Sequence, residues 1–417
     1  MTNFVTVDSI DEASRKLSGV VKTTPLQYCQ RLSEKYNSKI YFKREDLQKV
    51  RSYKIRGAYN LMSSLVNGEM KNGVVCASAG NHAQGVALSS AKLKIKAVIF
   101  MPNVTQLQKI NKVKSFGKEY VEIKLIGGTF DESNTAAKKF ALENDKMFIP
   151  PFDDYQVISG QGTVGKEIYE QLGGENLGYF FCPIGGGGLV SGAGTYLKTK
   201  LPHMKLIGVE PEGAAGMYYS VCKGKVTSLP ILDTFVDGAA VKTVGEKTFN
   251  IAKNLIDKFA LIANGAVCTT MIELYQNEGI ITEPAGILSI AALDEFAKEI
   301  KGKTIVCVIS GGNNDILRYP EIMEKSLVYQ GLKHYFLVQF TQKPGALKQF
   351  VSSALNPTDD IVRFEYIKKT SREMGPALVG VELVKKEDYP KLLDKMNKLG
   401  ISYTIINDSD VLFHYLV

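Results

Sequence analysis

Four consecutive glycines, Gly185, Gly186, Gly187 and Gly188, restrict the fold of this 417-residue chain more than any other feature. They follow an apolar run, residues 179–184, and precede residues 189–193, which can begin a helix. A strand, a turn without side chains and a helix N-terminus together bind an anion well, because backbone N–H groups point outward and the helix dipole favours negative charge. The pattern predicts a phosphate-bearing ligand, and the alternative is a flexible or tightly packed turn.

The two common nucleotide fingerprints are both missing from this glycine run. It does not end in Lys-Ser/Thr, as a P-loop does, and its spacing never gives G-x-G-x-x-G. Glu210 closes the next apolar segment, residues 206–209, about where a ribose-binding acid would stand. A dinucleotide ligand therefore remains an alternative, although an acid at a strand end is commonly a solvated loop residue.

The composition is that of an ordinary globular protein and does not indicate a nucleic-acid site. Its length indicates two or three domains. Hydrophobic residues make up 45% and charged residues 23%, which is ordinary for a soluble protein. The net charge of +8 is spread along the chain without the clustered basic and aromatic residues of a nucleic-acid site. A basic chain favours small anionic ligands.

Cysteine and histidine usage indicates a cytoplasmic protein without a metal centre. The six cysteines form no C-x-x-C pair, and several lie inside apolar runs, as expected for free thiols in a reducing compartment. The four histidines show no paired spacing, so a histidine-built metal site is not expected. We expect no membrane span, because no stretch approaches 18 apolar residues, and the first residues do not resemble a secretion signal.

Short apolar runs alternate with longer amphipathic segments up to about residue 318, which predicts βαβ units and parallel sheets. Polar motifs follow three of the predicted strands: residues 77–82, the glycine run and residues 310–315. Ligands of open α/β sheets bind at the carboxyl ends of the strands, so we expect these three segments to converge on one site. The predicted strands are residues 40–43, 73–76, 97–101, 122–125, 179–184, 206–209 and 304–310.

The C-terminal part follows a different plan. After a first region of residues 1–318 and a connector of residues 319–333, we expect residues 334–417 to form a compact module of their own. The predicted order is βαββαβ, the ferredoxin-like plan. Its segments are residues 335–340, 345–353, 361–368, 377–384, 388–399 and 403–406, with a last strand expected at residues 411–417. We expect this module to serve in packing, in dimerisation or in binding a small regulator.

A phosphate site without a nucleotide fingerprint, in a chain rich in lysine, raises the possibility of pyridoxal phosphate. That cofactor needs a lysine for its Schiff base. Lys54 stands between Tyr53 and Ile55 at the start of a helical run, where partial desolvation would lower its pKa and leave it nucleophilic. On sequence alone, an exposed lysine at a helix start remains an equal alternative.

Five motifs in a fixed order carry a family resemblance. They are residues 43–46 (KRED), 52–58 (SYKIRGA), 78–85 (SAGNHAQG), the glycine run, and 310–313 (SGGN). With them the chain resembles the biosynthetic threonine dehydratases (threonine ammonia-lyases), pyridoxal phosphate enzymes of fold type II, over about residues 5–318. Residues 342–347 (QKPGAL) resemble the single ACT-like regulatory domain of the shorter members. The resemblance implies an α/β catalytic part with two open, mostly parallel sheets, like the tryptophan synthase β subunit, and an α+β ferredoxin-like tail.

The resemblance also assigns roles to residues. Lys54 would hold the cofactor, with Tyr53 near its ring, and Asn81 would donate to its 3′ oxygen. Ser310 would face the ring nitrogen, which weakens the electron sink relative to a carboxylate partner and favours elimination over transamination. The cofactor phosphate would lie on Gly185, Gly186, Gly187 and Gly188, and the substrate carboxylate on Ser78 and the backbone of Ala79, Gly80, Asn81 and His82.

The implied reaction converts L-threonine to 2-oxobutanoate and ammonia, the first step of isoleucine biosynthesis, with L-serine a weaker substrate. Lys54 would act as the general base at Cα. Isoleucine is the implied inhibitor, valine a possible antagonist, and a homodimer or homotetramer the implied assembly. The alternatives are a serine-preferring dehydratase, another β-eliminating enzyme of fold type II, or a catalytically silent amino-acid sensor.

Three positions qualify the resemblance. Ala79 stands where related serine racemases carry a second serine, so we expect poor racemisation. Related enzymes with a divalent ion use two acids after the glycine run, but here Glu210 is followed by Ala214 and Gly216. We therefore expect no tight divalent site, because hard cations need several oxygen ligands. Glu283 lies in a family-like motif, residues 283–286 (EPAG), and receives no predicted role.

Overall fold

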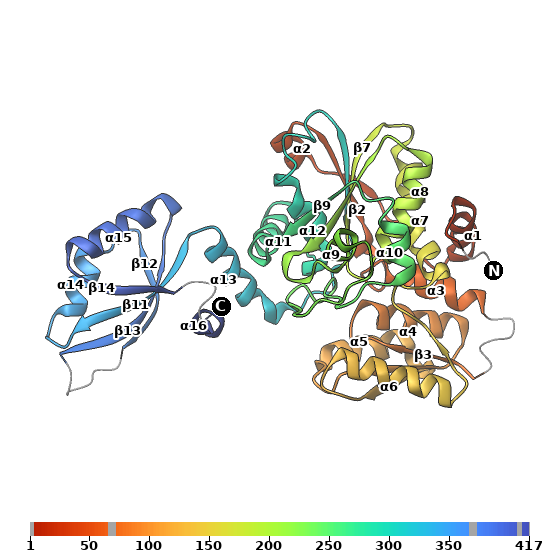
Figure 1. The fold of residues 1–417 in the computed structure, drawn as a ribbon, viewed down its shortest axis with the longest axis horizontal. Helices are drawn as coiled ribbons and strands as arrows, with labels where there is room; N and C mark the ends of the chain where they lie inside the picture. The colour runs from red at the N-terminus through yellow and green to blue at the C-terminus, as the bar shows by residue number, and fades with distance from the viewer. Residues whose placement is uncertain (1–3, 66–71, 367–372, 407–410, 417) are drawn as a thin grey trace. The chain divides into compact units, whose positions relative to one another are not determined.

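The computed structural model describes residues 4–65, 72–366, 373–406 and 411–416 (Figure 1). The chain divides into two compact units. The first comprises Met1–Asn264 and Leu274–Asn314, and the second comprises Gly265–Glu273 and Asp315–Val417. No helix in the described ranges is both long and apolar enough to cross a lipid bilayer.

The first unit contains a larger, six-stranded sheet in the order β1-β2-β10-β7-β8-β9. Only β1, at the edge, is antiparallel to its neighbour. The carboxyl ends of the parallel strands β2, β10 and β7 therefore lie side by side at one edge, where a ligand site is expected. The strands are β1 (Leu26–Tyr28), β2 (Lys39–Arg44), β7 (Leu177–Pro183), β8 (Lys205–Pro211), β9 (Lys258–Ile262) and β10 (Thr304–Ile309).

The same unit contains a smaller sheet, all parallel, in the order β5-β4-β3-β6. Its central strands are buried on both faces, so their sequences are continuously apolar rather than alternating. Val74 and Cys76 face helices α4 and α5, whereas Val75 and Ala77 face α6. The elements are β3 (Val74–Ala77), β4 (Ala97–Met101), β5 (Val121–Leu125), β6 (Met147–Phe148), α4 (Asn81–Leu93), α5 (Leu107–Gly117) and α6 (Phe130–Glu143).

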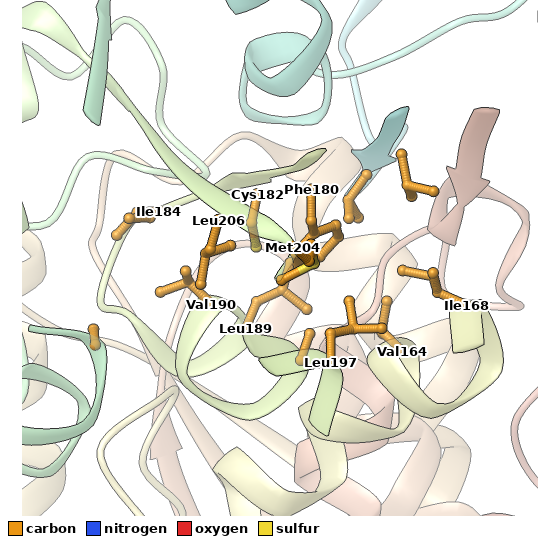
Figure 2. Packing of buried hydrophobic residues seen from close by; sticks show 14 of the residues in the cluster. Val164, Ile168, Phe180, Cys182, Ile184, Leu189, Val190, Leu197, Met204 and Leu206 are labelled. Atoms are coloured by element: carbon orange, nitrogen blue, oxygen red, sulfur yellow. The ribbon is translucent and has the colours of Figure 1, made fainter. Parts of the chain in front are cut away.

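Helices α7 (Tyr155–Leu172) and α8 (Gly188–Lys200) cover one face of the larger sheet. Figure 2 shows Phe180 and Cys182 of β7 directed at Val164 of α7 and Leu197 of α8. The two helices touch through glycine, because a Cβ on Gly165 would lie 2.6 Å from the carbonyl oxygen of Ala193. This close contact holds α8, the helix that begins at the glycine run, firmly against α7.

The remaining helices of the first unit pack on these two sheets or on the helices that cover them. Helix α12 packs on β10, β7 and β8, and α3 packs between α7 and α4. These helices are α1 (Val7–Leu17), α2 (Gln30–Tyr36), α3 (Lys54–Ser64), α9 (Gly216–Lys223), α10 (Glu246–Ala252) and α12 (Pro284–Ala291), with short 3-10 segments at Glu45–Leu47, Lys118–Tyr120, Glu212–Ala214 and Ala292–Asp294. Helix α11 (Asn264–Glu278) contributes residues to both units.

A buried ion cluster fixes α3 in place. The guanidinium of Arg56 donates to Glu45 at 2.7 Å and to Glu167 of α7 at 2.6 Å, and Lys43 of β2 donates to Glu167 at 2.6 Å. Two cations and two carboxylates balance in charge, so none of them is buried without a partner. Because Arg56 lies two residues after Lys54, the cluster also fixes the start of the helix that carries Lys54.

The second unit contains a four-stranded antiparallel sheet in the order β12-β13-β11-β14, covered by α14 and α15. The predicted βαββαβ order is confirmed, and its core includes Phe336, Val379 and Leu392. The elements are α13 (Tyr319–Tyr329), β11 (Lys333–Thr341), α14 (Ala346–Ser353), β12 (Asp360–Tyr366), β13 (Met374–Glu382), α15 (Tyr389–Lys398), β14 (Ser402–Ile406) and α16 (Val411–Leu416), with 3-10 segments at Ile316–Arg318 and Lys386–Asp388.

The last predicted strand, residues 411–417, is wrong. Val411–Leu416 forms helix α16, and Val417 lies outside the described residues, as do residues 367–368 of the predicted strand 361–368. A short apolar run does not distinguish strand from helix by periodicity alone. Within this segment Phe413 is buried beside Tyr335 and Ile406, whereas Val411 is exposed, which is a one-sided burial that a helical turn provides.

Candidate active site

Lys54 lies at the carboxyl edge of the larger sheet, where the segment before α3 pairs with the segment after β10. Ser52 forms an antiparallel bridge with Gly311, and the backbone N–H of Tyr53 donates to the carbonyl of Ser310 at 3.2 Å. Helix α3 then begins at Lys54. Ser310, the residue directly after β10, and the predicted cofactor lysine are therefore close neighbours.

The side chain of Lys54 is turned into the protein. Its Nζ donates to the carbonyl oxygen of Pro151 at 3.1 Å and lies 5.3 Å from the centre of the Tyr53 ring. Loss of hydration lowers the pKa of Lys54 to about 8, against a smaller opposing effect of the Glu283 carboxylate. The alternative of an exposed lysine at a helix start does not hold, and the amine is poised for proton transfer near neutral pH.

The loop after β3 leads into the N-terminus of α4 beside Lys54. Helix α4 begins at Asn81, and its N-cap, Gly80, supplies no side-chain cap. A Cβ on Gly85 would lie 3.1 Å from the carbonyl oxygen of Lys54, so α4 rests directly on the start of α3. Ser78, Ala79 and Gly80 are partly exposed, and backbone N–H groups at a helix start suit a carboxylate.

The ring of His82 does not face this loop. It is buried, and its Nε2 lies 2.9 Å from the carbonyl oxygen of Ile149. Burial, together with the positive charge of Lys54, lowers the pKa of His82 to about 3, so the imidazole is neutral. Only the backbone of His82 is placed to contact a ligand at the helix start.

The glycine run forms the turn between β7 and α8. Gly187 is the N-cap of α8 and has φ +92°, which a residue with a Cβ adopts only with strain. A Cβ on Gly187 would lie 2.6 Å from Cε of Met217, and one on Gly185 would lie 3.1 Å from Cα of Ala239. No side chain caps α8 in the structure as described, so its first N–H groups are available to an anion.

Residues 151–152 join Lys54 to the glycine turn. The carbonyl of Pro151 accepts from Lys54, and the ring of Phe152 occupies the space that a Cβ on Gly186 would need. Thr248 holds the other side, since its hydroxyl donates to the carbonyl of Gly186 at 2.7 Å. None of these three residues is predicted from the sequence, because no motif marks them.

Asn81 joins the loop after β3 to the segment after β10. Its Nδ2 donates to Oε1 of Glu283 at 2.6 Å, and its Oδ1 accepts from Nδ2 of Asn313 at 2.7 Å. Ser310 is buried, and its hydroxyl donates to the carbonyl of Ala285 at 3.3 Å. With Lys54 and the glycine turn, the three segments expected to converge lie around one site.

Glu210, at the end of β8, is turned into the protein. It is fully buried, and its two carboxylate oxygens accept from the backbone N–H groups of Met217 at 2.8 Å and Tyr218 at 2.7 Å. Burial raises the pKa of Glu210 to about 8. An inward carboxylate engaged by backbone donors is not a ribose-binding acid. Within the described ranges no cluster of three or more His, Cys, Asp or Glu is placed to bind a metal.

Comparisons with known proteins agree with this geometry. Residues 17–311 match the family of pyridoxal-phosphate dependent enzymes, and residues 324–416 match the C-terminal regulatory domain of threonine dehydratase. A biosynthetic L-threonine dehydratase of Halalkalibacterium halodurans is 52% identical over 413 residues, which are 99% of each chain.

Two solved structures are similar to most of this chain. One is the processed form of threonine deaminase isoform 2 from Solanum lycopersicum, with a TM-score of 0.72 and 39% identity over 78% of this chain and 96% of that one. The other is serine racemase from Dictyostelium discoideum, with a TM-score of 0.69 and 33% identity over 75% of this chain and 99% of that one.

The fold and the site therefore define a pyridoxal-phosphate dependent enzyme of fold type II. Within that class the chain belongs to the family of the biosynthetic L-threonine dehydratases, with a catalytic part and a C-terminal regulatory part. The dinucleotide alternative is accordingly wrong.

Burial of Lys54 predicts a stability effect in the cofactor-free chain. Its pKa falls from the ordinary 10.5 to about 8 on folding, so the unfolded chain binds more protons between these pH values. Below pH 8 the buried ammonium destabilises the fold by up to about 3 kcal/mol, and this cost disappears as the pH rises toward 10.5.

We therefore expect cofactor-free Lys54→Met to be more stable than the cofactor-free wild type at pH 7. Urea unfolding at pH 7 and at pH 9.5 measures the difference, which should shrink at the higher pH. A difference in stability between the variant and the wild type that is the same at pH 7 and at pH 9.5 would contradict the assigned burial of the amine.

Proposed function

We propose that this chain deaminates L-threonine to 2-oxobutanoate and ammonia by α,β-elimination of water, using pyridoxal phosphate. The observation that carries the proposal is the meeting of Lys54, the glycine turn and the Ser78–His82 loop around one site. Identity of 52% over the whole chain to a biosynthetic L-threonine dehydratase supports threonine as the substrate.

The residues present suit this cofactor. Lys54 would hold it through Nζ, with Tyr53 beside the ring and Asn81 donating to the 3′ oxygen. Gly185, Gly186, Gly187 and Gly188 would bind the phosphate, since the turn leaves no room for a Cβ. When bound, the cofactor supplies an electron sink for the pair of electrons left at Cα of the amino acid.

Ser310 would turn its hydroxyl away from the carbonyl of Ala285, to which it now donates at 3.3 Å, and donate to the ring nitrogen. A hydroxyl can donate to an unprotonated nitrogen but cannot hold it protonated as a carboxylate does. The sink is therefore weaker than with an acidic partner, which favours rapid loss of a leaving group over transamination.

The protein groups around the substrate account for binding and proton transfer. Ser78 and the backbone N–H groups of Ala79, Gly80, Asn81 and His82 would bind the carboxylate at the start of α4. The amino group of the substrate would first displace Lys54, and the freed amine, with a pKa of about 8, would then remove the Cα proton as general base. The β-hydroxyl would take up a proton and leave as water, and the resulting enamine would react with a second water to give the oxo acid and ammonia.

Two features bear on specificity. Ala79 offers no hydroxyl for a second base on the opposite face of Cα, so we expect poor racemisation although a racemase shares the fold. A pocket discriminates one methyl group by only about 1–3 kcal/mol, so L-serine should react more slowly than L-threonine rather than not at all.

For the second unit we propose feedback inhibition by isoleucine, opposed by valine, in a homodimer or homotetramer. The match of residues 324–416 to a regulatory domain supports this role. We keep residues 1–318 as the catalytic domain, residues 319–333 as the connector and residues 334–417 as the ACT-like domain. Six free cysteines support a reducing, cytoplasmic location.

The test is the visible spectrum of the purified chain with added cofactor, followed by threonine. A yellow protein that forms 2-oxobutanoate is the expected result. A yellow protein that forms no oxo acid from threonine but does so from serine would favour the serine-preferring dehydratase. A colourless, inactive protein would contradict the proposed enzyme activity and favour an amino-acid sensor.

Adding isoleucine to the same assay tests the regulatory role. We expect isoleucine to slow oxo-acid formation and valine to reverse the inhibition, because an effector must bind two states of the protein differently. If isoleucine does not change the rate of oxo-acid formation, the second unit would instead serve in the assembly of the oligomer.

A further inference from the structure

Glu283 is a buried carboxylate at the N-cap of α12 to which the proposed reaction gives no role. It is 5% exposed. The surrounding backbone is shaped to admit it, because a Cβ on Gly311 would overlap its Oε1 and one on Gly238 would lie 3.3 Å from the same atom. Burying a carboxylate costs free energy, so its presence here suggests a role beyond filling space.

Both oxygens of Glu283 accept from the segments that surround Lys54. Oε1 accepts from Nδ2 of Asn81 at 2.6 Å, and Oε2 accepts from the backbone N–H of Asn313 at 3.2 Å. The side chain therefore joins the start of α4 to the segment after β10. An ionised carboxylate is an acceptor at both oxygens, which matches these two donors.

These contacts determine which way the Asn81 amide points. The carbonyl of Val50 can only accept, so the atom of Asn313 that lies 2.8 Å from it must be Nδ2. The second hydrogen of that nitrogen reaches Asn81 at 2.7 Å, so the atom of Asn81 that receives it must be Oδ1. The NH₂ group of Asn81 then faces Glu283, which takes one of its two hydrogens.

We propose that Glu283 is a positioning residue, which orients Asn81 so that the remaining N–H of its amide donates to the 3′ oxygen of the bound cofactor. This inference rests on the proposed function, because it requires pyridoxal phosphate in the site. Glu283 touches neither the cofactor nor the substrate in this assignment. Its effect on the 3′ oxygen passes through Asn81.

The charges around Glu283 bear on its ionisation. Burial raises its pKa to about 7, and Asp237 adds to that increase, whereas the hydrogen bonds from Asn81 and Asn313 and the charge of Lys109 lower it. The Lys54 ammonium also faces it. The carboxylate form that orients Asn81 is therefore held mainly by these two hydrogen bonds.

The test is a double-mutant cycle on the full chain, with the dissociation constant of pyridoxal phosphate and its bound visible band as readouts. Glu283→Gln keeps the shape but cannot accept at both positions, so we expect about tenfold weaker cofactor binding and a changed band. Asn81→Ala removes the donor and should weaken binding at least as much. When Asn81 is already alanine, Glu283→Gln should raise the dissociation constant of pyridoxal phosphate by less than about twofold, because its effect passes through Asn81.

A swapped pair separates positioning from folding. When Asn81→Asp is combined with Glu283→Gln, the glutamine amide can donate to the introduced aspartate while its oxygen still accepts from Asn313, so the thermal midpoint should recover. Cofactor binding should remain weak, since an aspartate side chain has no N–H to donate. Recovery of both would mean that Glu283 only stabilises the fold, which overturns the inference.

Glu210→Gln is the matched control, because it makes the same change at another buried carboxylate that lies outside the Asn81 contacts. We expect its cofactor affinity to stay within about twofold of the wild type. Equal binding by Glu283→Gln and the wild type, or fully multiplicative effects in the cycle, would overturn the positioning role. A wild type that binds no cofactor and forms no oxo acid would overturn the proposed function instead.

Discussion

Replacing Lys54 with alanine is expected to lower the rate of 2-oxobutanoate formation from threonine by at least about 10,000-fold. The variant loses the amine that would hold the cofactor and the base that would remove the Cα proton. It should also lose the visible band of the bound cofactor. The spectrum of the cofactor-loaded protein and a single-turnover assay with threonine measure both effects.

A lysine in exposed surroundings provides the control for this experiment. Lys139→Ala removes a lysine whose side chain is 75% exposed on α6, and it should leave both the band and the rate unchanged. Adding a small primary amine to Lys54→Ala should restore part of the rate, since removal of the side chain leaves space for a base of similar chemistry. A Lys54→Ala protein that keeps the wild-type band would show that another residue holds the cofactor.

The buried strands could be predicted because burial on both faces leaves an unbroken apolar run. The pattern predicts β4 (Ala97–Met101) with its observed bounds, and β10 (Thr304–Ile309) to within one residue. Strands β1, β6 and β9 are not among the predicted ones. β1 and β6 have only three and two residues, and all three lie at sheet edges, where pairing on one side leaves a weaker pattern.

The motifs that follow strands located the site, but the contacts within it depend on distant segments. Parallel strands place their carboxyl ends at one edge, which is why the glycine turn and Ser310 could be expected near each other. The contact between Asn81 and Glu283 spans 202 residues of sequence, and nothing local to either residue predicts it. The same holds for Phe152, whose ring closes the glycine turn.

Replacing Gly187 with alanine is expected to weaken pyridoxal phosphate binding by at least about 100-fold. Its φ of +92° disfavours any residue with a Cβ, and the added carbon would lie 2.6 Å from Met217 and 2.9 Å from Cβ of Thr248. The turn would have to shift to remove these close contacts. Two hydrogen bonds to the phosphate, worth about 1.5–3 kcal/mol each, would then be lost or lengthened.

Gly173→Ala isolates the backbone cost from the loss of the phosphate site. Gly173 also has a positive φ, +58°, at the end of α7, but a Cβ there meets nothing within 4 Å. Both variants should lose about 1–2 kcal/mol of stability from the left-handed backbone alone. Only Gly187→Ala should lose cofactor affinity in a fluorescence titration, and equal affinities of the two variants would show that the phosphate is held elsewhere.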